Sequence, residues 1–149
     1  MSKMIRKLHP TTKVVEKSWG REEWIVNNEM YCGKFLYLNK FHQSSMHYHK
    51  IKHETFYLDE GIIIFEIDGL SPRVMTPGNV QEILPNKKHR YTGIKKSRII
   101  EFSTHHEDED SYRIEGMLGG KVEDIRGFVR SLGLEEEVKP YLVDLKRRK

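Results

Sequence analysis

Residues 44–61, SSMHYHKIKHETFYLDEG, carry several side chains that can coordinate a metal ion. His47 and His49 lie two residues apart, so on a β-strand both imidazoles would point to the same face. Glu54 follows a short turn through residues 50–52 and begins the next predicted strand, where a hairpin would bring its carboxylate beside the two imidazoles. These three side chains could therefore reach one ion.

His89 is the fourth candidate ligand, and it follows another predicted strand and turn in the second half of the chain. Three imidazoles and one carboxylate suit a divalent Mn, Zn, Fe, Ni or Co ion, with coordination positions left open for a substrate. A lone histidine in a strand is more often structural, but a histidine pair, a spaced acid and a distant histidine together favour a site. We predict that one divalent metal ion is bound by His47, His49, Glu54 and His89.

Two further residues could move protons beside such a metal. Lys52 shares its strand parity with Glu54, and a neighbouring cation could lower the Lys52 pKa toward the working range. Glu101 lies in the apolar segment SRIIEFS, where an inward carboxylate among aliphatic side chains would suit a general acid or base. Alternation leaves other interpretations open: Lys52 could be a hairpin lysine in water, and Glu101 could face solvent or simply pair with Lys52.

Cations flank the fourth candidate ligand. Lys87, Lys88 and Arg90 surround His89 and could hold a phosphate group of a substrate, although lysines in such a turn are usually just exposed. We propose Lys87 and Arg90 as substrate-binding residues.

Other histidines and both tryptophans have simpler interpretations. We expect His53 to face outward beside Glu54. His105 and His106 adjoin the acidic run 107–110, where a solvated loop is favoured over a second metal site. Trp19 and Trp24 are expected to fill the core rather than stack on a sugar.

The elements that would position these residues are short strands. Turn residues separate apolar or aromatic runs at the spacing typical of all-β sandwiches and barrels. No helix is expected between the strands, so they must pair antiparallel. The predicted strands cover residues 13–17, 21–26, 34–38, 45–49, 54–58, 62–67, 73–76, 80–84 and 97–103.

The C-terminal part changes character after Gly119-Gly120. Apolar residues recur at helical spacing in KVEDIRGFVRSLG, and Gly133 is a plausible stop. A second short helix is expected from about Pro140. We predict a barrel domain over 1–118 and a helical extension over 119–149 that packs on the barrel or on a partner subunit.

Composition limits the possible classes of protein. The chain has 149 residues, one cysteine and a formal net charge of +4, which the terminal KRRK run alone could supply. Acidic runs at 107–110 and 135–137 interrupt any basic face, which disfavours nucleic-acid binding. Neither a signal peptide nor a membrane-spanning run is recognisable, so a cytoplasmic protein is expected.

Two motifs resemble those of the cupin superfamily. The first has the form HxH, three or four residues, Glu, six residues, Gly, and the second has a Gly, a Pro and a His. They are matched by His47, His49, Glu54 and Gly61, and by Gly78, Pro85 and His89. The usual final asparagine is replaced by Gly93. The resemblance covers roughly residues 14–103 and implies a small antiparallel jelly-roll barrel with a metal in its mouth.

A narrower resemblance concerns cupin-type sugar and sugar-phosphate isomerases. VVEKSWGREEWIV is similar to the opening segment of the mannose-6-phosphate isomerase group, with Ser18 in place of proline, and IIEFSTHHEDEDSYRIE resembles its closing segment. HYHKIKHE matches the HxHxxKxE form of the D-lyxose isomerase group. These likenesses imply a metal-dependent aldose–ketose isomerase, place Lys52 in its active site and favour an inward Glu101.

Two other functions compete with the isomerase. A metal-bound cupin could bind a small molecule without chemistry, and an iron dioxygenase would use the same four ligands. We expect a small-molecule sugar substrate, no nucleic-acid or membrane partner, and a homodimer. The sequence leaves open the sugar, its phosphorylation and the resident metal.

Overall fold

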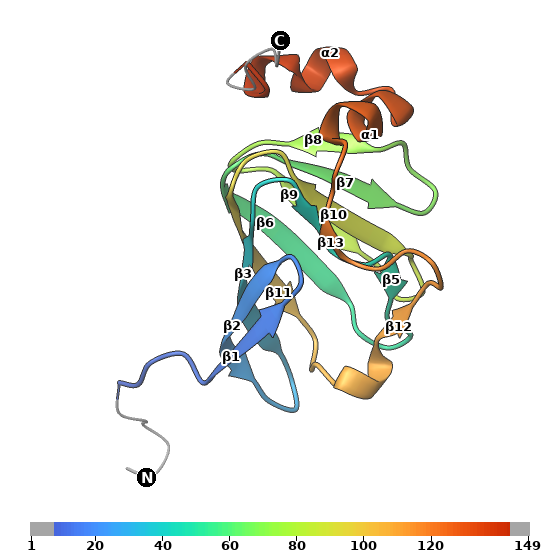
Figure 1. The fold of residues 1–149 in the computed structure, drawn as a ribbon. Helices are drawn as coiled ribbons and strands as arrows, with labels where there is room; N and C mark the ends of the chain where they lie inside the picture. Colours follow the sequence, from blue (N-terminus) through green and yellow to red (C-terminus); the bar gives the residue numbers. More distant parts are fainter. Residues whose placement is uncertain (1–7, 144–149) are drawn as a thin grey trace, which may run out of the picture.

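The computed structural model describes residues 8–143, which form two antiparallel β-sheets folded into a barrel (Figure 1). The first sheet has six strands in the order β1-β2-β3-β11-β6-β9, and each neighbouring pair is antiparallel. Its strands are β1 (Lys13–Lys17), β2 (Gly20–Asn27), β3 (Cys32–Leu38), β11 (Ser97–Ser103), β6 (Glu54–Glu60) and β9 (Val80–Ile83).

The second sheet is built around β10, which pairs with β4, β5 and β7. Strand β7 continues to β8, while β12 and β13 add to β5 and β4 respectively. Its strands are β4 (His42–Gln43), β5 (His47–Tyr48), β7 (Ile63–Ile67), β8 (Arg73–Met75), β10 (His89–Gly93), β12 (Tyr112–Arg113) and β13 (Gly120–Lys121).

The prediction of an all-β antiparallel barrel is confirmed, and every predicted strand overlaps an observed one. Four observed strands were not predicted: β4, β10, β12 and β13. Three of these have only two residues, too few to show a period of two. The segment HRYTG of β10 mixes polar residues with a terminal glycine, so its composition does not indicate a strand.

Side chains alternate between the barrel interior and its outside, as strand geometry requires. In β11, Ile99 and Glu101 are almost fully buried, whereas Phe102 is more than half exposed. The interior between the sheets is filled by one apolar cluster that includes Leu36, Leu58 and Phe65. Burial of this cluster stabilises both sheets and fixes which residues face inward.

Two short α-helices follow the barrel: α1 (Ile125–Ser131) and α2 (Glu135–Val138). The Asp124 carboxylate accepts a hydrogen bond from the backbone amide of Gly127, which caps the start of α1. Gly133 has a φ of 72°, a backbone conformation that glycine adopts without strain, and it separates the helices as predicted.

The second helix begins earlier than predicted. It starts at Glu135, and Pro140 lies in the 3₁₀ turn η3 (Lys139–Tyr141) that follows it. Another 3₁₀ turn, η2 (Asp108–Asp110), lies in the connection between β11 and β12. Residues 144–149, including the basic run, lie outside the described part of the chain. No helix in residues 8–143 is long and apolar enough to cross a membrane.

The helices pack on the barrel and lie at the opposite end from the β1–β2 hairpin (Figure 1). Val129 and Val138 from the helices share a buried cluster with Ile64 of β7 and with Ile94 after β10. The segment after residue 118 is not wholly helical, because Gly120–Lys121 forms β13 within the second sheet.

Candidate metal centre

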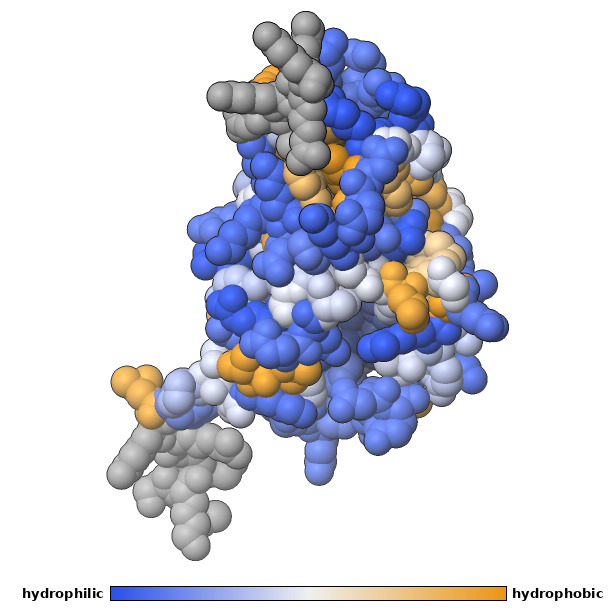
Figure 2. Space-filling model, viewed as in Figure 1, coloured by the Kyte–Doolittle hydropathy of each residue, from blue (hydrophilic) through white to orange (hydrophobic). Residues whose placement is uncertain are grey.

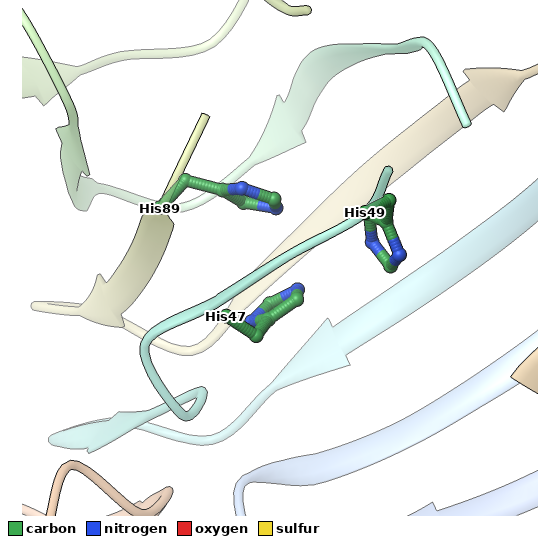
Figure 3. A group of neighbouring side chains, drawn as sticks. All are labelled: His47, His49 and His89. Atoms are coloured by element: carbon green, nitrogen blue, oxygen red, sulfur yellow. The ribbon is translucent and has the colours of Figure 1, made fainter. Parts of the chain in front are cut away.

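Three histidines converge inside the barrel, and their ligand atoms lie within 4.8 Å of one another (Figure 3). His47 lies on β5, His49 follows the end of this strand, and His89 begins β10. His47 and His89 are directly opposite in the antiparallel β5–β10 pair, so their side chains project from the same face. This cluster could hold a metal ion.

Backbone carbonyl groups orient all three imidazoles. Each Nδ1 atom lies 2.8–2.9 Å from a carbonyl oxygen, and the three oxygens belong to Ser45, Asp110 and Lys87. A carbonyl oxygen only accepts hydrogen bonds, so each Nδ1 must carry the proton and each neutral ring keeps a lone pair on Nε2. Burial, and then the neighbouring His89, lower the pKa of His47 to about 3, which keeps that ring available as a ligand.

Glu54 places a carboxylate against the cluster from the first residue of β6. Its Oε2 atom lies 3.6 Å from His49 Nε2 and 3.3 Å from His89 Nε2. Burial alone would raise the Glu54 pKa, but the ammonium group of Lys52 outweighs it and holds the pKa well below its usual value. The carboxylate is therefore ionised.

Two of these atoms face each other without a hydrogen bond. Glu54 Oε2 and His89 Nε2 are both buried, and neither has a hydrogen-bond partner among the described residues. Two buried acceptors at this distance are unfavourable unless a cation lies between them. The donor types therefore fit a divalent metal ion.

Lys52 lies beside this cluster and is almost fully buried. Its ammonium group is 3.0 Å from Glu54 Oε1, 3.1 Å from Glu101 Oε2 and 2.9 Å from His106 Nδ1. The expected lowering of its pKa is wrong. Burial acts in that direction, but the carboxylates of Glu101 and Glu54 outweigh it and raise the pKa above its ordinary value. Lys52 is therefore a hydrogen-bond donor rather than a base.

Glu101 faces the barrel interior, which resolves the ambiguity of its strand. It is 3% exposed and accepts a hydrogen bond from Ser103 Oγ, at 3.0 Å, in addition to its contact with Lys52. The sequence had left open an exposed Lys52 and an outward Glu101, and neither alternative matches the structure. The pairing of the two residues, which was also considered, is observed.

The turn between His49 and Glu54 is held by Asp110, a residue that sequence reasoning did not single out. The backbone amides of Lys50, Ile51 and Lys52 donate to its carboxylate at 2.9, 3.2 and 2.9 Å. Burial would raise the Asp110 pKa, but these amide hydrogen bonds lower it overall. Its own carbonyl orients His49. In the sequence, the only sign of a role for Asp110 was its place in the acidic run 107–110.

His106 was expected in a solvated loop, but its ring is largely buried and contacts Lys52. Its Nδ1 accepts from the Lys52 ammonium group, and its Nε2 lies 2.9 Å from Asp108 Oδ1. Burial first, and Lys52 second, lower its pKa. His105 instead contacts the carbonyl of Asn28, so the two histidines do not form a joint metal site.

A polar cavity of about 420 Å³ opens onto these residues. His47, His49, Lys52, Glu54 and Glu101 all line it. Trp19 belongs to the apolar core and also reaches the cavity wall. Trp24 lines the cavity but is only half-buried and lies outside that core, so the expectation that both tryptophans fill the core is confirmed for Trp19 alone. Figure 2 shows this side of the molecule as mainly hydrophilic and hollowed beside the β1–β2 hairpin. A small polar molecule could enter from here.

Neither predicted substrate-binding cation lines this cavity. Lys87 is exposed in the turn before β10. Arg90 follows the inward His89 and therefore points outward, where it pairs with Glu66 at 2.9 Å and lies over the Phe128 ring of α1. The expectation that these two residues hold a substrate does not fit the geometry. His53 faces outward, as expected, and contacts Glu82.

Solved structures share the fold of this chain at low sequence identity. An RmlC-like cupin from Shewanella frigidimarina aligns with a TM-score of 0.60 and 16% identity, over 66% of this chain and 87% of its own. Pac13 from Streptomyces, described as a nucleoside dehydratase, aligns with a TM-score of 0.62 and 10% identity, over 72% of this chain and 92% of its own.

An ectoine synthase from P. lautus aligns with a TM-score of 0.60 and 14% identity, over 75% of this chain and 85% of its own. No protein-family model matches the sequence, and no curated protein matches it. The comparisons therefore show a cupin jelly-roll fold, a fold on which enzymes of varied chemistry occur.

Proposed function

We propose that this cupin-fold chain is a metal-dependent enzyme that interconverts the aldose and ketose forms of a sugar or sugar phosphate. The observation that carries the proposal is the buried Lys52–Glu101 pair beside the histidine cluster, in a polar cavity. The resemblance of HYHKIKHE to the D-lyxose isomerase group supports the same assignment. Enzymes among the structural neighbours support catalysis in general terms.

The metal would be held by His47, His49, His89 and Glu54. When bound, a divalent ion at this position supplies Lewis acidity, which polarises a carbonyl group and favours loss of a proton from the adjacent carbon. The ionised Glu54 carboxylate and the Nε2 atoms of the three imidazoles provide the donor set.

The chain's own residues would handle the proton. The isomerisation moves one proton between C1 and C2 and a second proton between the oxygens that these carbons carry. The Glu101 carboxylate, which lines the cavity, is placed to accept the carbon-bound proton and return it, and the second proton would pass directly between the two neighbouring oxygens. Lys52 keeps its proton and donates hydrogen bonds to Glu101 and Glu54. It would also stabilise negative charge that develops on a substrate oxygen.

Neither alternative function has a comparable use for this pair. An iron dioxygenase would need the metal ligands but no buried ammonium–carboxylate pair beside them. A non-catalytic binding protein would need shape and hydrogen bonds, and a buried ion pair is a costly way to provide these. The Lys52–Glu101 pair therefore favours acid–base chemistry.

A substrate screen tests the proposal. The protein is loaded in turn with Mn, Zn, Fe, Ni or Co, and aldoses, ketoses and their phosphates are followed by NMR spectroscopy. We expect metal-dependent interconversion of at least one pair. If the metal-loaded protein binds one of these compounds but converts none, it is a binding protein and the proposal fails.

A further inference from the structure

The cavity differs in charge between its buried end and its mouth. Four charged residues at the buried end are at most 3% exposed, two of each sign: Lys34, Lys52, Glu54 and Glu101. The mouth is lined by three cations, which are Lys13, Lys17 and Arg113. Its acids are already engaged, because Glu22 lies 3.2 Å from Lys34 and Asp108 lies 2.9 Å from His106. The mouth therefore has an excess of positive charge.

Arg113 is directed into the cavity by its strand. In the antiparallel β12–β5 pair it lies directly opposite His47, one of the clustered histidines. Residues at directly opposed positions project from the same face of a sheet, so the Arg113 side chain is on the histidine side. None of the ion pairs found within residues 8–143 involves Arg113, which leaves its guanidinium group available for a ligand.

Lys17 faces the same opening from the other side. On β1, Lys13, Val15 and Lys17 alternate inward, and all three line the cavity. Lys17 and Arg113 also both line an adjoining hollow of about 380 Å³. The acid nearest to Lys17 is Glu22 at 3.8 Å, a looser contact than the one Glu22 makes with Lys34. Two cations with unused hydrogen-bonding capacity therefore border one opening.

We propose that Lys17 and Arg113 form a subsite for an oxyanion group carried by the substrate. This inference rests on the proposed function, since it places the reacting carbonyl at the histidine cluster and the anionic group at the mouth. A guanidinium group can bind a phosphate or carboxylate through two parallel hydrogen bonds, and the ammonium group adds a second charge. The substrate class is then an anionic sugar, either a phosphate ester or a sugar acid.

Sulfate binding tests the subsite without any turnover. Metal-loaded parent, Lys17→Gln and Arg113→Gln proteins are titrated with sulfate by calorimetry at low ionic strength, with metal content measured in each. Lys87→Gln is the matched control, because it removes an exposed cation outside the cavity. Loss of one charge-assisted hydrogen bond should weaken binding about tenfold in each mouth variant, with little change in the control. Equal sulfate affinity in all four proteins overturns the subsite.

Substrate preference distinguishes a phosphate ester from a sugar acid as the source of the oxyanion. It also tests the subsite separately from the isomerase activity. Neutral sugars, their terminal phosphates and the matching sugar acids are compared, and the parent should show the lowest KM for one of the anionic classes. Arg113→Gln should raise that KM, whereas Lys87→Gln, which removes an exposed cation outside the cavity, should leave it unchanged. Equal KM values for neutral and anionic sugars contradict the subsite but not the isomerase. Sulfate binding without turnover of any sugar contradicts only the isomerase.

Discussion

The two ends of the cavity are built differently. At the buried end, Lys52 contacts two carboxylates and a histidine, each at 3.1 Å or less. At the mouth, Arg113 is exposed and has no ion pair within the described residues. A buried charge is costly unless it is paired, whereas water solvates an exposed charge and leaves it free to bind a ligand. The buried end is therefore suited to fixed reaction geometry, and the mouth to selecting a charged substrate.

The largest expected effect comes from removing the proton acceptor at the buried end. Glu101→Gln keeps the side chain's shape but abolishes its basicity, so turnover should fall by about 10² to 10⁴ while the metal is retained. Glu82→Gln is the matched control, since Glu82 is an exposed residue that contacts only His53 among its described ion-pair partners. Steady-state kinetics on the best sugar measures both. Normal turnover in Glu101→Gln would remove Glu101 from the mechanism.

A smaller effect is expected at the turn that joins two ligands. Asp110→Ala leaves three backbone amides without their acceptor, so we expect a loss of roughly 1–3 kcal/mol in the free energy of unfolding. Metal affinity should also fall about 10- to 100-fold, because the His49–Glu54 spacing is no longer held. Denaturant unfolding and a metal titration report the two quantities. Unchanged metal affinity would show that the turn does not position the ligands.

A modest pH effect should distinguish the two ends. The pKa of His47 is about 3 in the folded chain, against an ordinary value of 6.5. Between these values the unfolded chain binds a proton that the folded chain does not, so the free energy of unfolding should fall as the pH is lowered from 6.5 toward 3. His49 and His106, whose pKa values are also lowered, act in the same direction.

Thermal unfolding of the metal-free protein across this pH range measures the effect. His47→Gln should flatten the dependence, whereas Arg113→Gln should leave it unchanged because the guanidinium charge stays constant there. An identical pH dependence in His47→Gln and the parent would contradict the assigned protonation of the cluster.

Local periodicity explains what could be predicted from the sequence. The period of two in a strand placed His47 and His49 on one face, and the turn signals delimited most strands. The same rule could have corrected the prediction that Arg90 binds the substrate, because a residue adjacent to an inward His89 must point outward. The all-β fold followed from the number and spacing of short strands.

Contacts between distant segments explain what could not be predicted. Asp110 holds a turn some 60 residues away, and His106 reaches Lys52 across 54 positions. Lys52 was expected to have a pKa lowered by a neighbouring cation, whereas the carboxylate of Glu101, which approaches from β11, raises this pKa. The two-residue strand that carries Arg113 is too short to leave a pattern in the sequence. Homodimer formation stays a prediction.

The most direct test of the account is the metal content of the protein. Elemental analysis of parent and His49→Ala, each purified after loading with one divalent metal, should show one ion per chain in the parent and a large loss in the variant. Circular dichroism must show that the β-structure of His49→Ala is intact, and His53→Ala, which removes an outward histidine, should keep its metal. Full metal retention in a folded His49→Ala protein would contradict the proposed metal centre.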